Sequence, residues 1–239
     1  MPISIPITQG RIDIAPICDS TQPKITTMDL NQKIKQQSLE AVARLKDKNL
    51  FGRRSDSFSM RLPGTDEFLW LQDPAAGFQR TSIDEIGVQC RHHAEIYRVR
   101  ADAGAVLCAS TDWSEQLCEL KEVPPTLFDE QARHIGELRA PVVAGDLEGL
   151  VGAVRSGANI AIYGSQFMGV GMTRDRVVFN VELFKKCATA FLIARSSAMR
   201  IRTIPIWVRF IAGRRLRNDQ RKAAESYSQG LIPQGMNAY

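Results

Sequence analysis

Residues 93–106 read His93-Ala94-Glu95-Ile96-Tyr97-Arg98-Val99-Arg100-Ala101-Asp102-Ala103-Gly104-Ala105-Val106, and this stretch decides the fold. Its first half completes a predicted helix that ends near Arg98. The Asp102-Ala103-Gly104 segment then turns the chain, and the apolar run 105–109 is short enough to be a buried strand. A helix that leads through a tight turn into a buried strand is typical of an α/β domain.

Outside this stretch, the pattern predicts further elements in both directions. On the N-terminal side we expect an extended arm over 1–28, a helix from Asp29 to Lys48, a hairpin with strands 57–61 and 68–72, and a helix opened by the capping box 82–85. On the C-terminal side we expect helical segments at 113–120, 127–136 and 147–155, strands at 159–163 and 167–171, a helix from Thr173 to Ala198 and a tail helix over 206–224. The predicted domains are an arm (1–28), one α/β domain (29–198) and a basic C-terminal extension (199–239) that packs on the domain or on a neighbouring subunit.

The positive charge of the chain is concentrated near its C-terminus. The chain has 239 residues, of which 44% are hydrophobic and 24% charged, as in globular rather than disordered or fibrous proteins. The net charge is +5. Eight basic residues and one acidic residue between Ser196 and Lys222 give that window +7, so the remaining chain carries −2. A generally basic nucleic-acid binder is therefore disfavoured.

The cysteines and the N-terminus indicate a cytoplasmic protein. Five cysteines form no CxxC pair, and the start MPISIPITQG lacks the charged and apolar regions of a signal peptide. No run of about 18 apolar residues is present for a membrane span. We therefore expect a cytoplasmic location, and membrane partners are disfavoured.

The stretch 93–106 resembles the class II aldolase/adducin family, whose members carry H-x-x-x-Y-x-x-R-P-D before a strand that reads roughly A-V-V-H-x-H-S. Residues 57–61, Ser-Phe-Ser-Met-Arg, resemble the family's N-I-S-x-R strand. Proline turns at 123–125 and 140–143, and the late strands before the long helix, follow in the family's order. The resemblance covers roughly residues 30–198. It implies a three-layer α/β/α domain with a mostly antiparallel central sheet, to which this chain adds its basic C-terminal helical extension, and a ring-shaped homotetramer with sites between subunits.

The departures from the family fall on its metal site. Family enzymes hold a divalent metal with three histidines, and a glutamate on the H-x-x-x-Y helix moves the proton. The H-x-H positions are Cys108 and Ser110 here, and the glutamate position is Gln89, whose amide takes no proton near neutral pH. The third histidine position falls within 163–166, and the chain has no histidine after His134. We therefore expect no metal and no cofactor.

The candidate site residues follow from the same alignment. The candidate catalytic residues are His93, Cys108 and Asp112, and the candidate substrate-binding residues are Ser57, Ser59, Arg61, Gln89 and Ser110. Arg61 is the family's retained arginine, and a guanidinium can bind a carboxylate with two hydrogen bonds. His93 shares a helix face with Gln89, where the family places its proton-transfer group.

Each candidate also has an alternative interpretation. His93 can be a packed, hydrogen-bonded core histidine. Cys108 can be a nucleophile with His93 as its base, or a zinc ligand together with His93 and His134. Asp112 can be the cap of the helix that follows it.

The predicted tail helix carries an apolar stripe at Trp207, Phe210 and Ile211 and a basic stripe further along at 214, 217 and 221. It can dock on the domain or on a neighbour with a solvated basic face, bind an anionic membrane or nucleic acid, or bring arginines to an anionic substrate. The first interpretation is favoured. The expected partners are therefore other copies of the chain in a tetramer, with a small anionic molecule as a further candidate ligand, whereas nucleic acid and membrane are disfavoured.

Two functions from different classes remain in view. The first is a divergent aldolase-like enzyme that acts without a metal on a small carbonyl or carboxylate compound, with lyase, decarboxylase or isomerase chemistry in which arginines or His93 stabilise an oxyanion. The second is a non-catalytic assembly or binding module comparable with the adducin head. An undetected metal-dependent aldolase is a further alternative. A cavity lined by convergent polar groups favours the enzyme, and one filled by apolar side chains favours the module.

Overall fold

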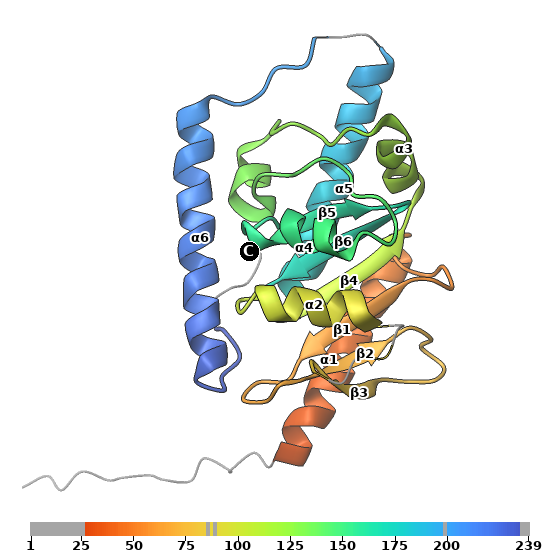
Figure 1. The fold of residues 1–239 in the computed structure, drawn as a ribbon, viewed down its shortest axis with the longest axis vertical. Helices are drawn as coiled ribbons and strands as arrows, with labels where there is room; N and C mark the ends of the chain where they lie inside the picture. The colour runs from red at the N-terminus through yellow and green to blue at the C-terminus, as the bar shows by residue number, and fades with distance from the viewer. Residues whose placement is uncertain (1–26, 85–86, 88–89, 198–199, 235–239) are drawn as a thin grey trace, which may run out of the picture.

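The computed structural model describes residues 27–234 except 85–86, 88–89 and 198–199. Most of the predicted arm, residues 1–26, and Gln89 lie outside the described residues. The elements follow in the order α1 (Thr27–Asp47), β1 (Ser57–Arg61), β2 (Glu67–Leu71), β3 (Gln79–Ser82), α2 (Arg91–Val99), β4 (Ala105–Ser110), α3 (Asp112–Leu120), the π-helical turn η2 (Gln131–Ile135), α4 (Leu147–Arg155), β5 (Ile160–Tyr163), β6 (Gln166–Gly171), α5 (Arg174–Ser196) and α6 (Ile206–Ser228) (Figure 1).

The six strands form one sheet in the order β3-β2-β1-β4-β6-β5. Every neighbouring pair is antiparallel. The expected hairpin is present, because Phe58 lies opposite Leu71 and Arg61 lies opposite Phe68. The strand β4, which the apolar run 105–109 predicts, lies between β1 and β6 in the middle of the sheet.

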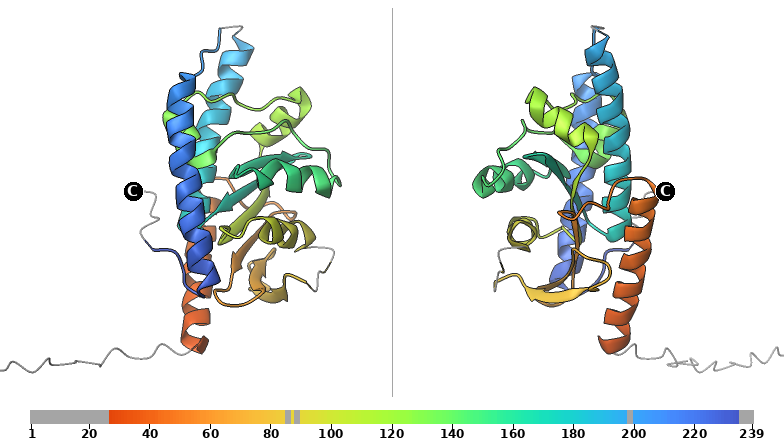
Figure 2. Two further views of the ribbon diagram at one scale, coloured as in Figure 1. Left: turned by 60° about the vertical axis from the view of Figure 1, so that its left-hand side comes forward. Right: turned by 90° about the vertical axis from the view of Figure 1, so that its right-hand side faces the viewer.

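Alternating side chains divide the core into two layers. Along β4, Leu107 and Ala109 face a cluster that includes side chains from α1 and α5, whereas Val106 and Cys108 face a second cluster with α2 and α4. Figure 2 shows the helices on both sides of the sheet. The predicted three-layer α/β/α arrangement with an antiparallel sheet is confirmed.

One predicted helix begins in the wrong place. Ser82 ends the edge strand β3 rather than capping a helix, and its hydroxyl accepts a hydrogen bond from the Asp84 backbone at 3.1 Å. The helix α2 begins only at Arg91. The strand β3 is a largely solvent-facing edge strand, so apolar and polar residues do not alternate along it. The sequence pattern therefore does not reveal it.

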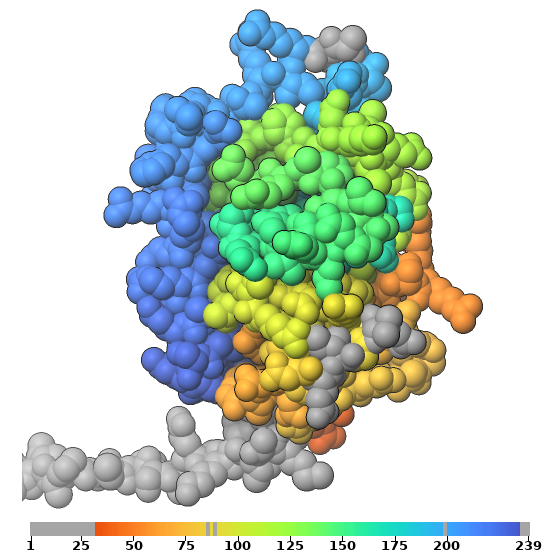
Figure 3. Space-filling view, viewed as in Figure 1, coloured from red at the N-terminus to blue at the C-terminus, as the bar shows by residue number. Residues whose placement is uncertain are grey.

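The tail helix α6 packs along the domain through a single face. Its buried residues recur at helical spacing and are Ala212, Leu216, Gln220, Ala223 and Tyr227. Tyr227 donates a hydrogen bond to the Met172 carbonyl at 2.9 Å, and it fits there because Gly104 has no side chain: a Cβ at Gly104 would lie 1.9 Å from the Tyr227 hydroxyl. Figure 3 shows α6 as a ridge along one edge of the molecule. The predicted helix is confirmed and continues to Ser228.

The described part of the chain contains no helix that combines the length and the apolar character needed to span a bilayer.

Candidate functional site

A closed hydrogen-bond network joins β1 to α2 on the α2 face of the sheet. Ser57 and Ser59 alternate with Phe58, so both hydroxyls face α2. The His93 Nε2 atom lies 2.8 Å from Ser57 Oγ, and His93 Nδ1 lies 2.8 Å from Ser59 Oγ. Ser59 Oγ is also 2.8 Å from the Tyr97 hydroxyl, which follows His93 by one helical turn. The structure therefore brings three predicted site residues together.

The imidazole at the centre of this network is sealed from solvent. His93 and Ser59 are fully buried, and Ser57 is 2% exposed. Burial lowers the pKa of His93 well below its usual range, and the adjacent His92 lowers it further. A neutral imidazole has one donor and one acceptor nitrogen, and the two serine hydroxyls satisfy both. This is the arrangement of a packed core histidine, because neither nitrogen is left for a substrate.

The Arg61 guanidinium likewise forms its hydrogen bonds with groups of the protein itself. Its Nε donates to the Ala103 carbonyl at 2.9 Å, and its Nη2 donates to the carbonyls of Tyr97 at 2.6 Å and Arg100 at 3.3 Å. The guanidinium carbon lies 5.0 Å from the centroid of the Tyr97 ring and 5.8 Å from that of Tyr227. Burial lowers the pKa of Arg61. A cation is favourable here because two of the carbonyls belong to the C-terminal end of α2.

A buried ion pair between Arg100 and Asp102, neither of which is a candidate site residue, holds the turn between α2 and β4. Arg100 Nε and Nη2 bind the two Asp102 carboxylate oxygens at 2.8 Å each. Nη1 donates to the carbonyls of Val154 and Ala158, and Nη2 donates to Asn159 Oδ1 at 2.7 Å. The R-x-D spacing was the signal, since it matches the family's R-P-D. The pair fixes α2 against α4 and β5.

The positions that correspond to the family's metal ligands do converge in space. Ser110 on β4 lies opposite Gln166 on β6, which lies opposite Tyr163 on β5. Cys108 lies two residues before Ser110 on the same face and is opposite Met168. The sheet therefore brings together the positions at which the family resemblance expects metal ligands.

The donor groups at this location do not fit a divalent metal. Cys108 is 1% exposed, and burial raises the pKa of its thiol to about 12, so it is not a thiolate at neutral pH. Tyr163 uses its hydroxyl oxygen to accept a hydrogen bond from the Gly145 backbone at 2.9 Å. Within the described ranges, no three His, Cys, Asp or Glu side chains are grouped to hold a metal ion.

The proposed zinc triad of Cys108, His93 and His134 is not assembled. His134 Nδ1 accepts a hydrogen bond from Arg176 at 2.8 Å, and its ring packs edge-on against Phe179 of α5. That places His134 with the α5 layer, whereas Cys108 and the α2 histidine belong to the opposite layer. Burial and the adjacent arginines lower the pKa of His134 to about 4.

Asp112 and Ser110 line a cavity of about 360 Å³ where β4 ends, which we call the β4-exit cavity. The Asp112 side chain is 91% exposed, and its carboxylate lies 2.9 Å from the Arg53 guanidinium. The alternative interpretation of Asp112 as a helix cap is wrong, because the Thr111 hydroxyl accepts the hydrogen bond from the Ser114 backbone at 3.3 Å. Asp112 therefore lies at the surface beside Arg53, whereas the His93 network is buried.

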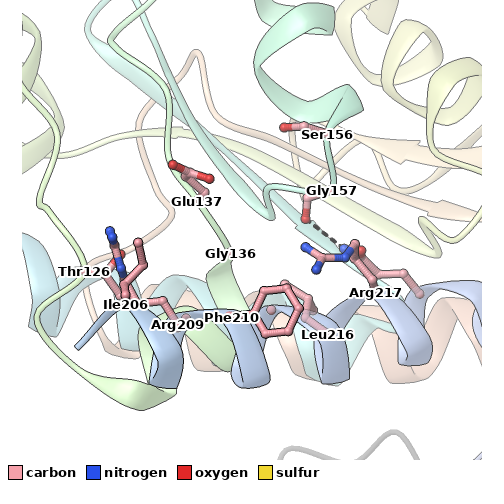
Figure 4. A pocket seen from close by; sticks show the side chains of 13 residues that line it. Thr126, Gly136, Glu137, Ser156, Gly157, Ile206, Arg209, Phe210, Leu216 and Arg217 are labelled. Carbon is pink, nitrogen blue, oxygen red and sulfur yellow. Dashed lines mark hydrogen bonds between the residues drawn. The ribbon is translucent and has the colours of Figure 1, made fainter. Parts of the chain in front are cut away.

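A second cavity, of about 350 Å³, lies between α6 and the domain, and we call it the α6 cavity. Figure 4 shows Arg209, Phe210 and Arg217 on one side of it, facing Glu137 and Ser156. None of the predicted site residues lines it. In the sequence, Arg209 and Arg217 look like any other basic residue of the tail.

Comparison with known proteins places this geometry in a structural class. No protein-family model matches the sequence, and no curated protein matches it. Among solved structures, an L-fuculose 1-phosphate aldolase superposes with a TM-score of 0.67 at 14% identity, over 77% of this chain and 96% of the aldolase. The L-fuculose 1-phosphate aldolase from Glaciozyma antarctica PI12 gives 0.66 at 14% identity, over 85% of this chain and 90% of that one.

An aldolase II superfamily protein from Pseudomonas syringae superposes with a TM-score of 0.61 at 18% identity, over 83% of this chain and 93% of that one. The chain therefore has the class II aldolase/adducin-like fold. These identities establish the fold, and the chemistry of the site has to be argued from the side chains present.

Proposed function

We propose that this chain is a non-catalytic binding or assembly module built on the class II aldolase fold. The observation that carries the proposal is the closed network around His93, in which both ring nitrogens bind serine hydroxyls and the side chain is fully buried. A proton-transfer group must reach its substrate directly or through one water. His93 has no exposed atom with which to do so.

The surroundings of Cys108 support the same proposal. Cys108 packs in the apolar layer with Val106, Ala161 and Met168, and Tyr163 packs against that layer. The place at which the family holds its metal is thus filled by apolar side chains and a protonated thiol. This is the filled cavity that favours a module over an enzyme.

We expect purified protein to hold less than about 0.1 divalent metal ion per chain, because a protonated thiol and hydroxyls are poor ligands for zinc. Inductively coupled plasma mass spectrometry of protein purified without chelator measures this directly. EDTA should leave the melting temperature unchanged. A zinc content near one per chain that EDTA removes, with a fall in melting temperature, would contradict the proposal.

Self-assembly is the second part of the proposal, and α6 supports it. The residues Ile206, Trp207, Phe210 and Ile211 of α6 are between 47% and 73% exposed, and of these Trp207 and Ile211 do not line the α6 cavity. A contiguous exposed patch of large apolar side chains usually marks an interaction surface. A second copy of the chain is the proposed occupant, and a tetramer is the proposed state.

The double substitution Trp207→Ser and Ile211→Ser should lower the mass of the assembly, since it removes apolar area from this patch. Multi-angle light scattering after size exclusion measures the mass. Val143→Ser is the matched control, because Val143 is 75% exposed but lies outside α6. A monomeric wild-type protein, or an unchanged mass in the double variant, would count against assembly through α6.

The metal-free enzyme is the competing function, and the β4-exit cavity is the observation that favours it. Ser110 and Asp112 reach this cavity, and Lys185 lines it from α5. Arg53 already pairs with Asp112 and with Glu115, so the carboxylate is held by a cation rather than left free as a base. Turnover that Asp112→Asn abolishes without loss of stability would establish this alternative.

A further inference from the structure

The α6 cavity contains two arginines without a carboxylate partner. Arg209 and Arg217 lie two helical turns apart on α6, and both line the cavity. The Arg209 Nε atom is buried and has no hydrogen-bond partner among the described residues. Arg217 likewise forms no ion pair with any carboxylate in the described part of the chain. A buried guanidinium nitrogen without an acceptor is costly, because its hydration has been lost and nothing replaces it.

Two other basic residues in and beside α6 are paired with carboxylates. Arg133 forms an ion pair with Asp219 of α6 at 2.5 Å, and Arg221 binds Glu225 at 2.6 Å. The helix therefore has carboxylates available for some of its cationic neighbours. Arg209 and Arg217 are among the basic residues of α6 without a carboxylate partner in the described part of the chain, and they are the two that line the cavity.

The remaining lining defines what that ligand must look like. Phe210 and Leu216 supply apolar surface, while Ser156 supplies a hydroxyl. Glu137 is the one carboxylate among the lining residues, so the two arginines leave the cavity with a single net positive charge. The floor is fixed, because Gln220 donates to the Gly157 carbonyl at 2.8 Å, the dashed line in Figure 4.

We propose that the α6 cavity is a binding site for a compact organic anion, whose carboxylate or phosphate head is held by Arg209 and Arg217 and whose body packs on Phe210. The cavity volume of about 350 Å³ is within the range of small-molecule sites. Glu137 accepts a hydrogen bond from a hydroxyl or ammonium group of the ligand and disfavours a second anionic group. This inference gives the proposed binding module a ligand class and rests on that proposed function.

Isothermal titration calorimetry with the full chain tests the site, in 100 mM sodium chloride. The probes are benzoate, phenyl phosphate and inorganic phosphate. Benzoate and phenyl phosphate distinguish a carboxylate from a phosphate head, and inorganic phosphate lacks the apolar body. We expect at least one aromatic probe to bind with one site per chain and at least tenfold more tightly than inorganic phosphate. If none of the probes binds, or if phosphate binds as tightly as both aromatic probes, the proposal is wrong.

Substitutions on α6 separate the cavity from general attraction to a basic surface. Arg209→Gln and Arg217→Gln should each weaken binding about tenfold, because each removes a charge-assisted hydrogen bond. Arg214→Gln removes the same charge from an exposed position that does not line the cavity, and it should change affinity less than twofold. Equal losses in all three variants would show attraction to the basic surface only and would overturn the proposal.

Gly213 provides a variant whose result does not depend on weakening the fold. Gly213 lines the cavity within α6, and a Cβ there would meet only Arg217 Nη1, at 3.5 Å. Gly213→Leu should fill the cavity while raising helix propensity, so it should abolish probe binding at an unchanged or higher melting temperature. Retained binding in this variant would place the probe elsewhere. The metal-content and activity measurements do not depend on this cavity. If the probes fail to bind, those measurements therefore still test the proposed binding or assembly module on their own.

Discussion

Replacing His93 with alanine is expected to lower the free energy of unfolding by about 3 kcal/mol, because the missing imidazole leaves a cavity and leaves two buried hydroxyl groups without a hydrogen-bond partner. Ser57 and Ser59 would each lose a hydrogen bond in a region with no access to water. For a chain of this length, that change corresponds to a fall in melting temperature of about 9 °C. Urea denaturation and differential scanning calorimetry measure the two quantities.

His92→Ala is the matched control for this substitution. It removes the same side chain one position earlier, where the Nε2 atom is buried but has no hydrogen-bond partner. Its effect should therefore be at most about 1 kcal/mol, since no network is broken. A His93→Ala protein with unchanged stability that had lost a measured turnover would show that His93 is catalytic instead.

Mild acid is expected to destabilise the protein through all three of its histidines. Burial lowers the pKa of His92 and His134 to about 4 each, and that of His93 well below its usual range. In the unfolded chain these groups bind a proton below about pH 6.5. The unfolded state therefore binds more protons between about pH 6.5 and 5, and the free energy of unfolding falls as the pH falls.

The expected slope follows from the number of protons. Each histidine that stays neutral in the folded state contributes about 1.4 kcal/mol per pH unit in this window. His93 contributes this fully, whereas His92 and His134 are only half-buried and contribute less because of solvent screening. Urea denaturation at pH 7.5, 6.5 and 5.5 measures the slope, which should be smaller in His93→Ala. Stability that is independent of pH from 7.5 to 5 would contradict the burial of these groups.

The central elements are predictable from the sequence because their signals are local. The apolar run that became β4, the Thr173 cap of α5 and the tail helix α6 all depend on residues close in sequence. The start of α2 was wrong because Ser82 hydrogen-bonds locally at the end of a polar edge strand, and such a bond resembles a helix cap in sequence.

The candidate site shows how far a sequence can predict side-chain roles. Ser57 and Ser59, which the family resemblance selected, both lie within hydrogen-bond distance of His93 in the structure. The partners of these residues and of Arg61, however, include backbone carbonyls such as that of Ala103 and depend on packing between distant elements. No sequence pattern shows which hydroxyl or carbonyl group a side chain will hydrogen-bond to. The roles of these residues therefore follow from their burial and their hydrogen bonds in the structure.

The arginines of the α6 cavity illustrate the same limit. Arg209 and Arg217 are part of a basic tail in which many residues look alike in sequence. They differ from Arg214 only because the helix docks with one face toward η2 and the end of α4. That docking depends on Tyr227 fitting over Gly104, more than 120 residues away in the chain.

The most direct test of the central claim, that the site is a closed structural core, is proton exchange next to a carbonyl. Dihydroxyacetone phosphate and pyruvate are incubated with the protein in D2O, with added zinc or with EDTA, and deuterium incorporation is followed by NMR. Cleavage of L-fuculose 1-phosphate is measured in parallel. We predict no exchange or cleavage above the protein-free blank in either condition. Exchange or cleavage that depends on the protein and is lost in His93→Asn, with folding retained, would contradict the account.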